Sequence, residues 1–240
     1  MPSTSNDSFK FFVYIVESPS ASDIYHGRSE GGLVAQALSL DLIPCVARTA
    51  INPVAFFAAL KIGLLEAMGN FREHLPILHL SAHGGESGLQ LSNEHIISWN
   101  QLRDLVIPIN ESLGGNLLLC MSACEGYSAC QMAMRVEDAP HPYFGFVGNY
   151  EKPTWSDTAV AYSAFYHRLS KGARVGEAVE AMKIASGNSA WVCETAEEAK
   201  RGFIEYLNQV NPPAARQKLE EDAENKILSP DAKALERGAG

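Results

Sequence analysis

LLLCMSACEG, residues 117–126, and PILHLSAHGG, residues 76–85, organise this 240-residue chain. Each begins with a short apolar run, typical of a strand buried on both faces of a parallel sheet. In each stretch the apolar run is followed by a Ser-Ala pair and then by a chemically active residue. That residue is Cys124 in the first stretch and His83 in the second. Because ligands bind at the carboxyl ends of strands in open α/β sheets, the two stretches predict that His83 and Cys124 share a site.

Apolar strand-length runs alternate with helical patterns along most of the chain. Further strands are expected at residues 11–16, 43–49 and 143–147, and a short hairpin at 89–91 and 95–97. A loop is expected at 17–32, and helices are expected at residues 33–40, 52–68, 98–112, 127–135, 156–169, 175–186 and 195–208. The alternation predicts an α/β fold, a three-layer α/β/α sandwich with a mostly parallel central sheet.

The chain length suits one domain with a small appendage. We expect a disordered N-terminus at residues 1–10 and a domain at 11–210. Residues 211–240 follow a Pro-Pro pair and are rich in Ala, Glu, Lys and Arg without aromatics. They are predicted to form a charged C-terminal tail or solvated helix, or a segment that contacts a partner.

Charge and composition exclude several classes of protein. A net charge of −9 with no basic stretch argues against direct nucleic-acid binding. No export signal is visible near the first residue, and no apolar run reaches the ~18 residues that span a bilayer. Five scattered cysteines then indicate free thiols in a reducing compartment. We therefore expect a cytoplasmic protein with no membrane contact.

A histidine and a cysteine at neighbouring strand ends suit nucleophilic catalysis. A thiol attacks a carbonyl as thiolate, and imidazole is the usual proton acceptor because it titrates near neutral pH. We predict Cys124 as nucleophile and His83 as general base and then acid. The backbone N–H groups of Gly84 and Cys124 would form the oxyanion hole, while Gly85 and Gly126 allow the turns. The N-terminus of a following helix near residue 127 is expected to lower the thiol pKa.

These same residues carry a family resemblance. Residues 78–84 resemble the strand-then-His-Gly motif of clan CD cysteine peptidases, the group of caspases, metacaspases, gingipains and separase. Residues 117–126 resemble their apolar strand ending in Ala-Cys, and the pattern is most similar to the bacterial CHAT proteases. The resemblance continues through 144–148, Trp155 with Asp157, 165–166 and 175–185, so it covers about residues 11–187.

The resemblance implies a caspase-like fold, a His/Cys dyad and no metal or organic cofactor. It also implies limited proteolysis of a protein substrate, often in antiphage defence or regulated cell death, for example by activating a gasdermin-like effector. Activation in the group commonly depends on a partner, so a separate regulatory protein or the charged tail is expected to control this chain.

Substrate-binding residues are less well marked. Separase-like members receive a basic side chain on an acidic residue near the position of Asp157, which makes Asp157 a candidate; a helix cap explains it equally well. Glu17 and His26 follow the first strand and are candidates for shaping the cleft, although a plain loop explains them too.

Three alternatives remain open. A catalytically silent module could use the same fold to bind a partner protein. A flavodoxin-like or Rossmann domain would need a Gly-rich phosphate loop after the first strand. Residues 18–32 contain scattered glycines but not that pattern. A zinc site from Cys120, Cys124, Cys130 and a histidine has spacings unlike common zinc patterns, and Cys120 and Cys130 are expected to be buried small hydrophobes.

Overall fold

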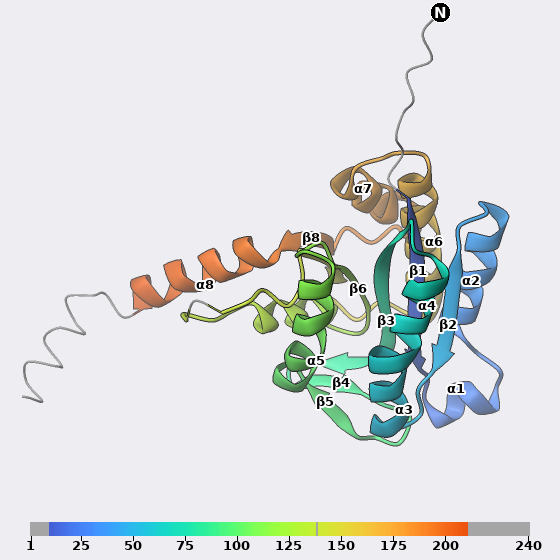
Figure 1. Cartoon of the computed structure of the whole chain (residues 1–240), viewed down its shortest axis with the longest axis horizontal. Helices are drawn as coiled ribbons and strands as arrows, with labels where there is room; N and C mark the ends of the chain where they lie inside the picture. Colours follow the sequence, from blue (N-terminus) through green and yellow to red (C-terminus); the bar gives the residue numbers. More distant parts are fainter. Residues whose placement is uncertain (1–9, 138, 211–240) are drawn as a thin grey trace, which may run out of the picture.

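A mostly parallel sheet runs through the centre of the computed structural model, which describes residues 10–137 and 139–210 (Figure 1). Its strand order is β2-β1-β3-β6-β7-β8, with parallel pairing except between β7 and β8. The hairpin β4–β5 extends from the end of β3. The strands are β1 (Phe11–Ser18), β2 (Cys45–Thr49), β3 (Leu75–Gly85), β4 (Gly88–Gln90), β5 (Ile96–Ser98), β6 (Leu118–Ser122), β7 (Gly145–Asn149) and β8 (Trp191–Thr195).

Helices cover both faces of this sheet. They are α1 (Ala21–Tyr25), α2 (Glu30–Leu40), α3 (Pro53–Ala58), the π-helical turn η1 (Ala59–Gly63), α4 (Leu64–Asn70), α5 (Trp99–Ser112), the 3-10 helix η2 (Gly126–Met132), α6 (Trp155–Ser170), α7 (Val175–Ser186) and α8 (Ala196–Val210). Asn52 caps α3 with Pro53 in its first turn, and Ser98 with Gln101 forms a capping box on α5.

Alternate residues of each strand enter two separate cores. On β1, Tyr14 and Val16 pack with α3, α4 and α5, whereas Val13 and Ile15 pack with α2, α6 and α7. The period of two explains why every residue of β1 is buried and why its sequence is apolar throughout. The structure thus confirms the three-layer α/β/α sandwich with a mostly parallel sheet.

The structure differs from the predicted elements in four places. The loop expected at 17–32 contains α1 and the start of α2, and the helix at 52–68 is interrupted by η1. The helix expected at 127–135 is the shorter η2. Strand β8 was missed because it is five residues long and half exposed, so its apolar signal is weak.

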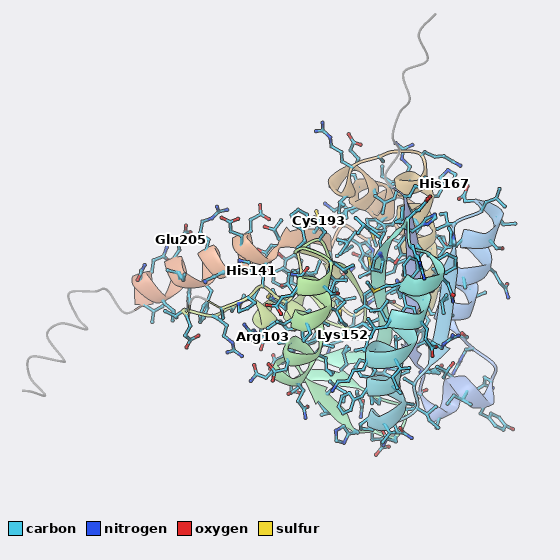
Figure 2. The ribbon with its side chains drawn as sticks, in the orientation of Figure 1. Arg103, His141, Lys152, His167, Cys193 and Glu205 are labelled. Atoms are coloured by element: carbon cyan, nitrogen blue, oxygen red, sulfur yellow. The ribbon has the colours of Figure 1, made fainter. Side chains whose placement is uncertain are left out.

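Polar contacts tie the outer helices together at the end of α6. Asp41, after α2, accepts bonds from His167 Nδ1 at 2.7 Å and Lys171 Nζ at 3.1 Å; His167 is labelled in Figure 2. At the opposite edge of the sheet, α8 projects outward from β8 (Figure 1). No helix in the described ranges is long and apolar enough to cross a membrane.

The predicted terminal segments fall largely outside the described residues. Residues 1–9 and 211–240 lie there, and so the expectations of a disordered N-terminus and a charged tail have no structural counterpart here. Lys10 is described, and its ammonium pairs with Glu73 at 3.2 Å beside the start of β1.

Candidate active site

His83 and Cys124 line one cavity at the carboxyl ends of neighbouring parallel strands. His83 lies near the end of β3, and Cys124 lies two residues after β6. The cavity has a volume of about 280 Å³ and is called the dyad cavity below. Its walls are Ala82, His83, Ser122, Ala123, Cys124, Pro153, Thr154, Trp155 and Thr158. A residue with acid–base chemistry and a nucleophile therefore face the same space.

The backbones of Gly84 and Cys124 lie against each other. A β-carbon on Gly84 would stand 2.5 Å from the carbonyl oxygen of Cys124 and 2.8 Å from the side chain of Ala123. Such distances are too short for any side chain, so the close approach requires glycine at position 84. The two residues expected to supply oxyanion donors are thus adjacent in space.

The turn after Cys124 is tightly held. Glu125 adopts the left-handed conformation, with φ of 51°, and its N–H donates to the Glu151 carbonyl at 2.9 Å. The Glu125 carboxylate pairs with Lys152 Nζ at 3.0 Å. A β-carbon on Gly126 would stand 2.9 Å from the carbonyl oxygen of Met121, so there is no room for a side chain at position 126. These contacts fix the position of Cys124 relative to the β7–α6 connection.

Burial raises the pKa of the Cys124 thiol, while the nearby Lys152 ammonium lowers it less strongly. The expected lowering by a helix N-terminus was wrong in direction. The following segment is a 3-10 helix of seven residues preceded by a left-handed residue, which provides little aligned dipole, and desolvation dominates. The resting group is therefore a neutral thiol that needs a base.

Two partners position the His83 imidazole. The Trp155 ring packs edge-on against it, with centroids 5.7 Å apart and an interplanar angle of 80°. Nε2 of His83 lies 3.8 Å from Asp23 Oδ2. Within the described residues, no hydrogen bond joins His83 to Cys124, and Nδ1 of His83 has no hydrogen-bond partner.

Asp23 is a buried carboxylate held on several sides. Arg28 Nε lies 2.9 Å from its Oδ1, and the Ser20 hydroxyl donates to its Oδ2 at 2.6 Å. The Ser20 bond is the main cause of a lowered Asp23 pKa, with Arg28 and His83 adding to it. Asp23 is thus an anion at neutral pH, aimed at the ring of His83.

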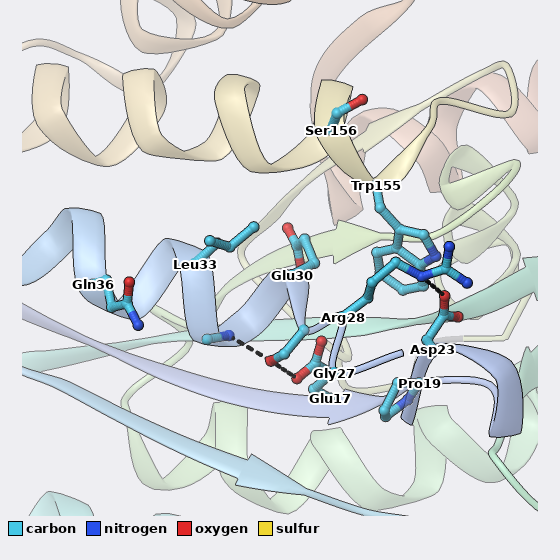
Figure 3. Close-up of a pocket in the computed structure, with 12 residues that line it drawn as sticks. Glu17, Pro19, Asp23, Gly27, Arg28, Glu30, Leu33, Gln36, Trp155 and Ser156 are labelled. Atoms are coloured by element: carbon cyan, nitrogen blue, oxygen red, sulfur yellow. Dashed lines mark hydrogen bonds and ion pairs between the residues drawn. The ribbon is translucent and has the colours of Figure 1, made fainter. Parts of the chain in front are cut away.

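A second cavity, called the acidic cavity below, adjoins the first and shares Trp155 with it (Figure 3). Its volume is about 430 Å³. Figure 3 shows Trp155 and Arg28 at one end and Gln36 at the other. Its walls carry the carboxylates of Glu17, Asp23 and Glu30, and its further walls are Pro19, Gly27, Arg28, Ser29, Gly32, Leu33, Gln36, Trp155 and Ser156. Three carboxylates against one guanidinium make this space electrically negative.

The three substrate-site candidates from the sequence occupy different positions. Glu17 lines the acidic cavity, 5% exposed, and accepts bonds from Ser29 Oγ at 2.6 Å and the Gly31 N–H at 3.1 Å. Asp157 is the third residue of α6 and completes a capping box with the N-cap Thr154, accepting from the Thr154 N–H at 3.0 Å and its hydroxyl at 2.7 Å; it lines neither cavity. His26 is exposed and ends α1.

Sequence reasoning missed Asp23 and Glu30 as components of the site. One signal was present for Asp23: Ser20 and Asp23 have the Ser-x-x-Asp spacing of a helix start, and Ser20 caps α1. For Glu30 no local pattern indicated a buried carboxylate. Across the described part of the chain, no three His, Cys, Asp or Glu side chains gather as a metal site.

Comparison with known proteins shows a distant structural likeness to solved structures. No protein-family model matches the chain, and no curated protein does. A solved structure, the complex of Porphyromonas gingivalis RgpB pro- and mature domains, aligns with a TM-score of 0.46 and 12% identity. The alignment covers 79% of this chain and 48% of that chain, so this chain spans about half its length. The likeness is too distant to bear on activity.

Proposed function

We propose that this chain is a cysteine endopeptidase that cleaves protein substrates at limited sites, with Cys124 as nucleophile and His83 as general base and then acid. The observation that carries the proposal is the dyad cavity, in which both side chains face one space at the ends of adjacent strands. The sequence resemblance to clan CD and CHAT peptidases supports the same assignment.

The contacts of His83 suggest how the proton moves. Because Nε2 faces the Asp23 anion, the Nε2–H tautomer is favoured and Nδ1 keeps a lone pair for the Cys124 proton. The imidazolium that results is stabilised by Asp23, which acts as a positioning residue. The thiolate then attacks the substrate carbonyl, and His83 returns the proton to the leaving amine.

The oxyanion formed in this step needs donors near the sulfur. The backbone N–H groups of Gly84 and Cys124 belong to residues in direct contact, which supports their proposed role. Such preorganised donors contribute about 10²–10³-fold in rate in other acyl-transfer enzymes.

The acidic cavity supports a preference for a basic residue before the cleaved bond. Its carboxylates, Glu17 among them, outnumber its single guanidinium, and it opens beside the dyad cavity across Trp155. Asp157 is less suited to this role, because its carboxylate is occupied by the α6 cap. We propose that Glu17, Asp23 and Glu30, rather than Asp157, recognise the basic side chain before the cleaved bond.

The proposed biological setting rests on the resemblance alone. It is a cytoplasmic peptidase in bacterial antiphage defence or regulated cell death, activated by a partner protein and acting on an effector such as a gasdermin-like pore former. It uses no metal or organic cofactor in this proposal, and it contacts neither nucleic acid nor membrane.

A second function is favoured by one specific observation. The thiol pKa is raised, and within the described chain the thiol is not bonded to His83. A catalytically silent protein-binding module on the same fold would show this arrangement permanently, whereas a peptidase would lose it when substrate or a partner binds.

Cleavage and thiol labelling together decide between the two. We expect co-expression with neighbouring gene products to yield a fragment with the wild-type chain but not with Cys124→Ala or His83→Ala. Iodoacetamide labelling, read at Cys124 by peptide mapping, should occur near neutral pH in the wild type when the candidate substrate or partner is bound. In His83→Ala it should require higher pH, because burial raises the thiol pKa. The exposed Cys193 is an internal control, labelled alike in both proteins. A Cys124 inert to the reagent, with no fragment from any candidate, would establish the binding module.

A further inference from the structure

Arg28 places a guanidinium at the end of the acidic cavity that adjoins the dyad cavity. Among the described residues that line the acidic cavity, it is the only lysine or arginine. Its Nε lies 2.9 Å from Asp23 Oδ1, and Figure 3 shows this pair beside Trp155. Because Trp155 lines both cavities, a side chain that enters from the dyad cavity arrives at the end where Arg28 lies.

The three carboxylates of the acidic cavity have different kinds of partner. Glu17 accepts hydrogen bonds from a hydroxyl and a backbone N–H, and Glu30 accepts one from the Ser122 hydroxyl at 3.1 Å. Among the three, within the described chain, Asp23 alone pairs with a lysine or arginine, and that partner is Arg28. The cavity thus already holds a cation at the carboxylate nearest to His83.

The two members of this pair differ in how freely they can move. The Asp23 side chain is 8% exposed and is held by the Ser20 hydroxyl, whereas the Arg28 side chain is 58% exposed. The Arg28 N–H donates to the Asp23 carbonyl at 2.8 Å, and its Nη2 reaches the Ser22 hydroxyl only at 3.3 Å. An exposed guanidinium returns to water at little cost, while a buried carboxylate left without a cation is costly. The arginine side chain is therefore the exchangeable partner.

We propose that Arg28 is a specificity-determining residue that competes with the substrate's basic side chain for Asp23. In the resting chain Arg28 occupies the carboxylate; a guanidinium or ammonium of the substrate replaces it, and the Arg28 side chain turns out to solvent. Asp23 keeps a cationic partner throughout this exchange. A neutral side chain offers Asp23 no cation and does not displace Arg28. The inference rests on the proposed assignment of this cavity to basic side chains.

Calorimetry with benzamidine as the probe tests the exchange. The parent is the full chain with Cys124→Ala, which removes turnover. Adding Arg28→Gln removes the competing cation, so we expect benzamidine to bind about fivefold tighter, which corresponds to the upper end of what an exposed ion pair contributes. Arg28→Lys keeps a cation, and its affinity should stay close to that of the parent. Benzamide, the neutral counterpart of the probe, should show no gain in Arg28→Gln.

Arg72→Gln is the matched control for the loss of one positive charge. Arg72 is exposed, donates from Nε to the Gly69 carbonyl at 3.2 Å and lines neither cavity, so its replacement should leave benzamidine binding unchanged. Phenylglyoxal labelling gives a readout that needs no substitution at Arg28. Read by peptide mapping in the parent, Arg28 should label faster when benzamidine is bound, while Arg72 labels at a constant rate.

Several outcomes would overturn the inference. Equal or weaker benzamidine binding in Arg28→Gln, or slower labelling of Arg28 on binding, would make Arg28 a wall that helps to hold the ligand. Binding of benzoate to the parent that is lost in Arg28→Gln would reassign the cavity to acidic side chains. No benzamidine binding to either protein would also exclude the exchange. Cleavage that depends on Cys124 and His83 is scored separately, so failure of the peptidase assignment is distinguishable.

Discussion

The two cavities that meet at Trp155 differ in what they offer a substrate. The dyad cavity is lined by the nucleophile, its base and small or apolar residues, with no carboxylate among its described walls. The acidic cavity holds three buried carboxylates and no nucleophile. One ring thus separates the space for bond cleavage from the space for side-chain recognition. Substitutions in the first should change turnover, and those in the second should change selectivity.

The largest effect on kcat is expected at Gly84, which follows His83 and lies against the backbone of Cys124. In Gly84→Ala the new β-carbon meets the Cys124 carbonyl at 2.5 Å, so the two backbones must separate and the oxyanion donors lose alignment. We expect kcat to fall about 10²–10³-fold, the usual cost of one misplaced donor. Cleavage of the co-expressed substrate, or of a peptide spanning its cut site, gives the measurement.

Gly85→Ala is the control for that change. A β-carbon there meets nothing within 4 Å, so the variant should keep nearly full activity. Equal activity of the two variants would show that the contact between Gly84 and Cys124 has no part in catalysis.

A smaller effect, on both cavities at once, is expected at Asp23. This carboxylate faces His83 and also lines the acidic cavity. In Asp23→Asn the imidazolium loses its anionic partner, so we expect kcat to fall about tenfold, part of the 10²–10⁴-fold that general base catalysis supplies. Preference for a basic over a neutral residue before the cleaved bond should weaken as well.

The pH dependence at Asp23 has a definite sign. Its pKa is lowered in the folded chain, so its ion pairing stabilises the fold above the ordinary aspartate pKa and is lost as pH falls through the lowered value. Asp41→Asn is a matched control, since Asp41 also pairs with a histidine and has a lowered pKa, but it lines neither cavity. A drop in kcat of the same size in both variants would exclude a local role for Asp23.

The sequence predicts the dyad cavity better than the acidic one for a physical reason. His83 and Cys124 end apolar runs whose burial on both faces is visible in composition, and parallel strands bring their carboxyl ends together. Glu17, Asp23 and Glu30 lie in a polar segment that reads as a loop. Their burial depends on a five-residue helix and on tertiary contacts with Ser122 and His79, which are 92 and 49 residues from Glu30 along the chain.

Local signals also explain the prediction that failed at Cys124. A helix is expected at residues 127–135, but Glu125 turns left-handed and the segment winds as a 3-10 helix. The direction of the thiol pKa then follows from burial, which no short stretch of sequence reveals.

The smallest effect is expected at Asp157, which tests where recognition resides. Its carboxylate forms the reciprocal half of the α6 capping box, whose N-cap is Thr154. Asp157→Ala leaves the Thr154 cap in place and should lower the free energy of unfolding by less than the ~1 kcal/mol of a lost N-cap. Selectivity between basic and neutral peptides should stay unchanged, because Asp157 lines neither cavity. Glu17→Gln, which alters a wall of the acidic cavity, should reduce that selectivity. Urea unfolding and paired peptide assays give the two measurements. Lost selectivity in Asp157→Ala with none in Glu17→Gln would move recognition from the acidic cavity to the start of α6.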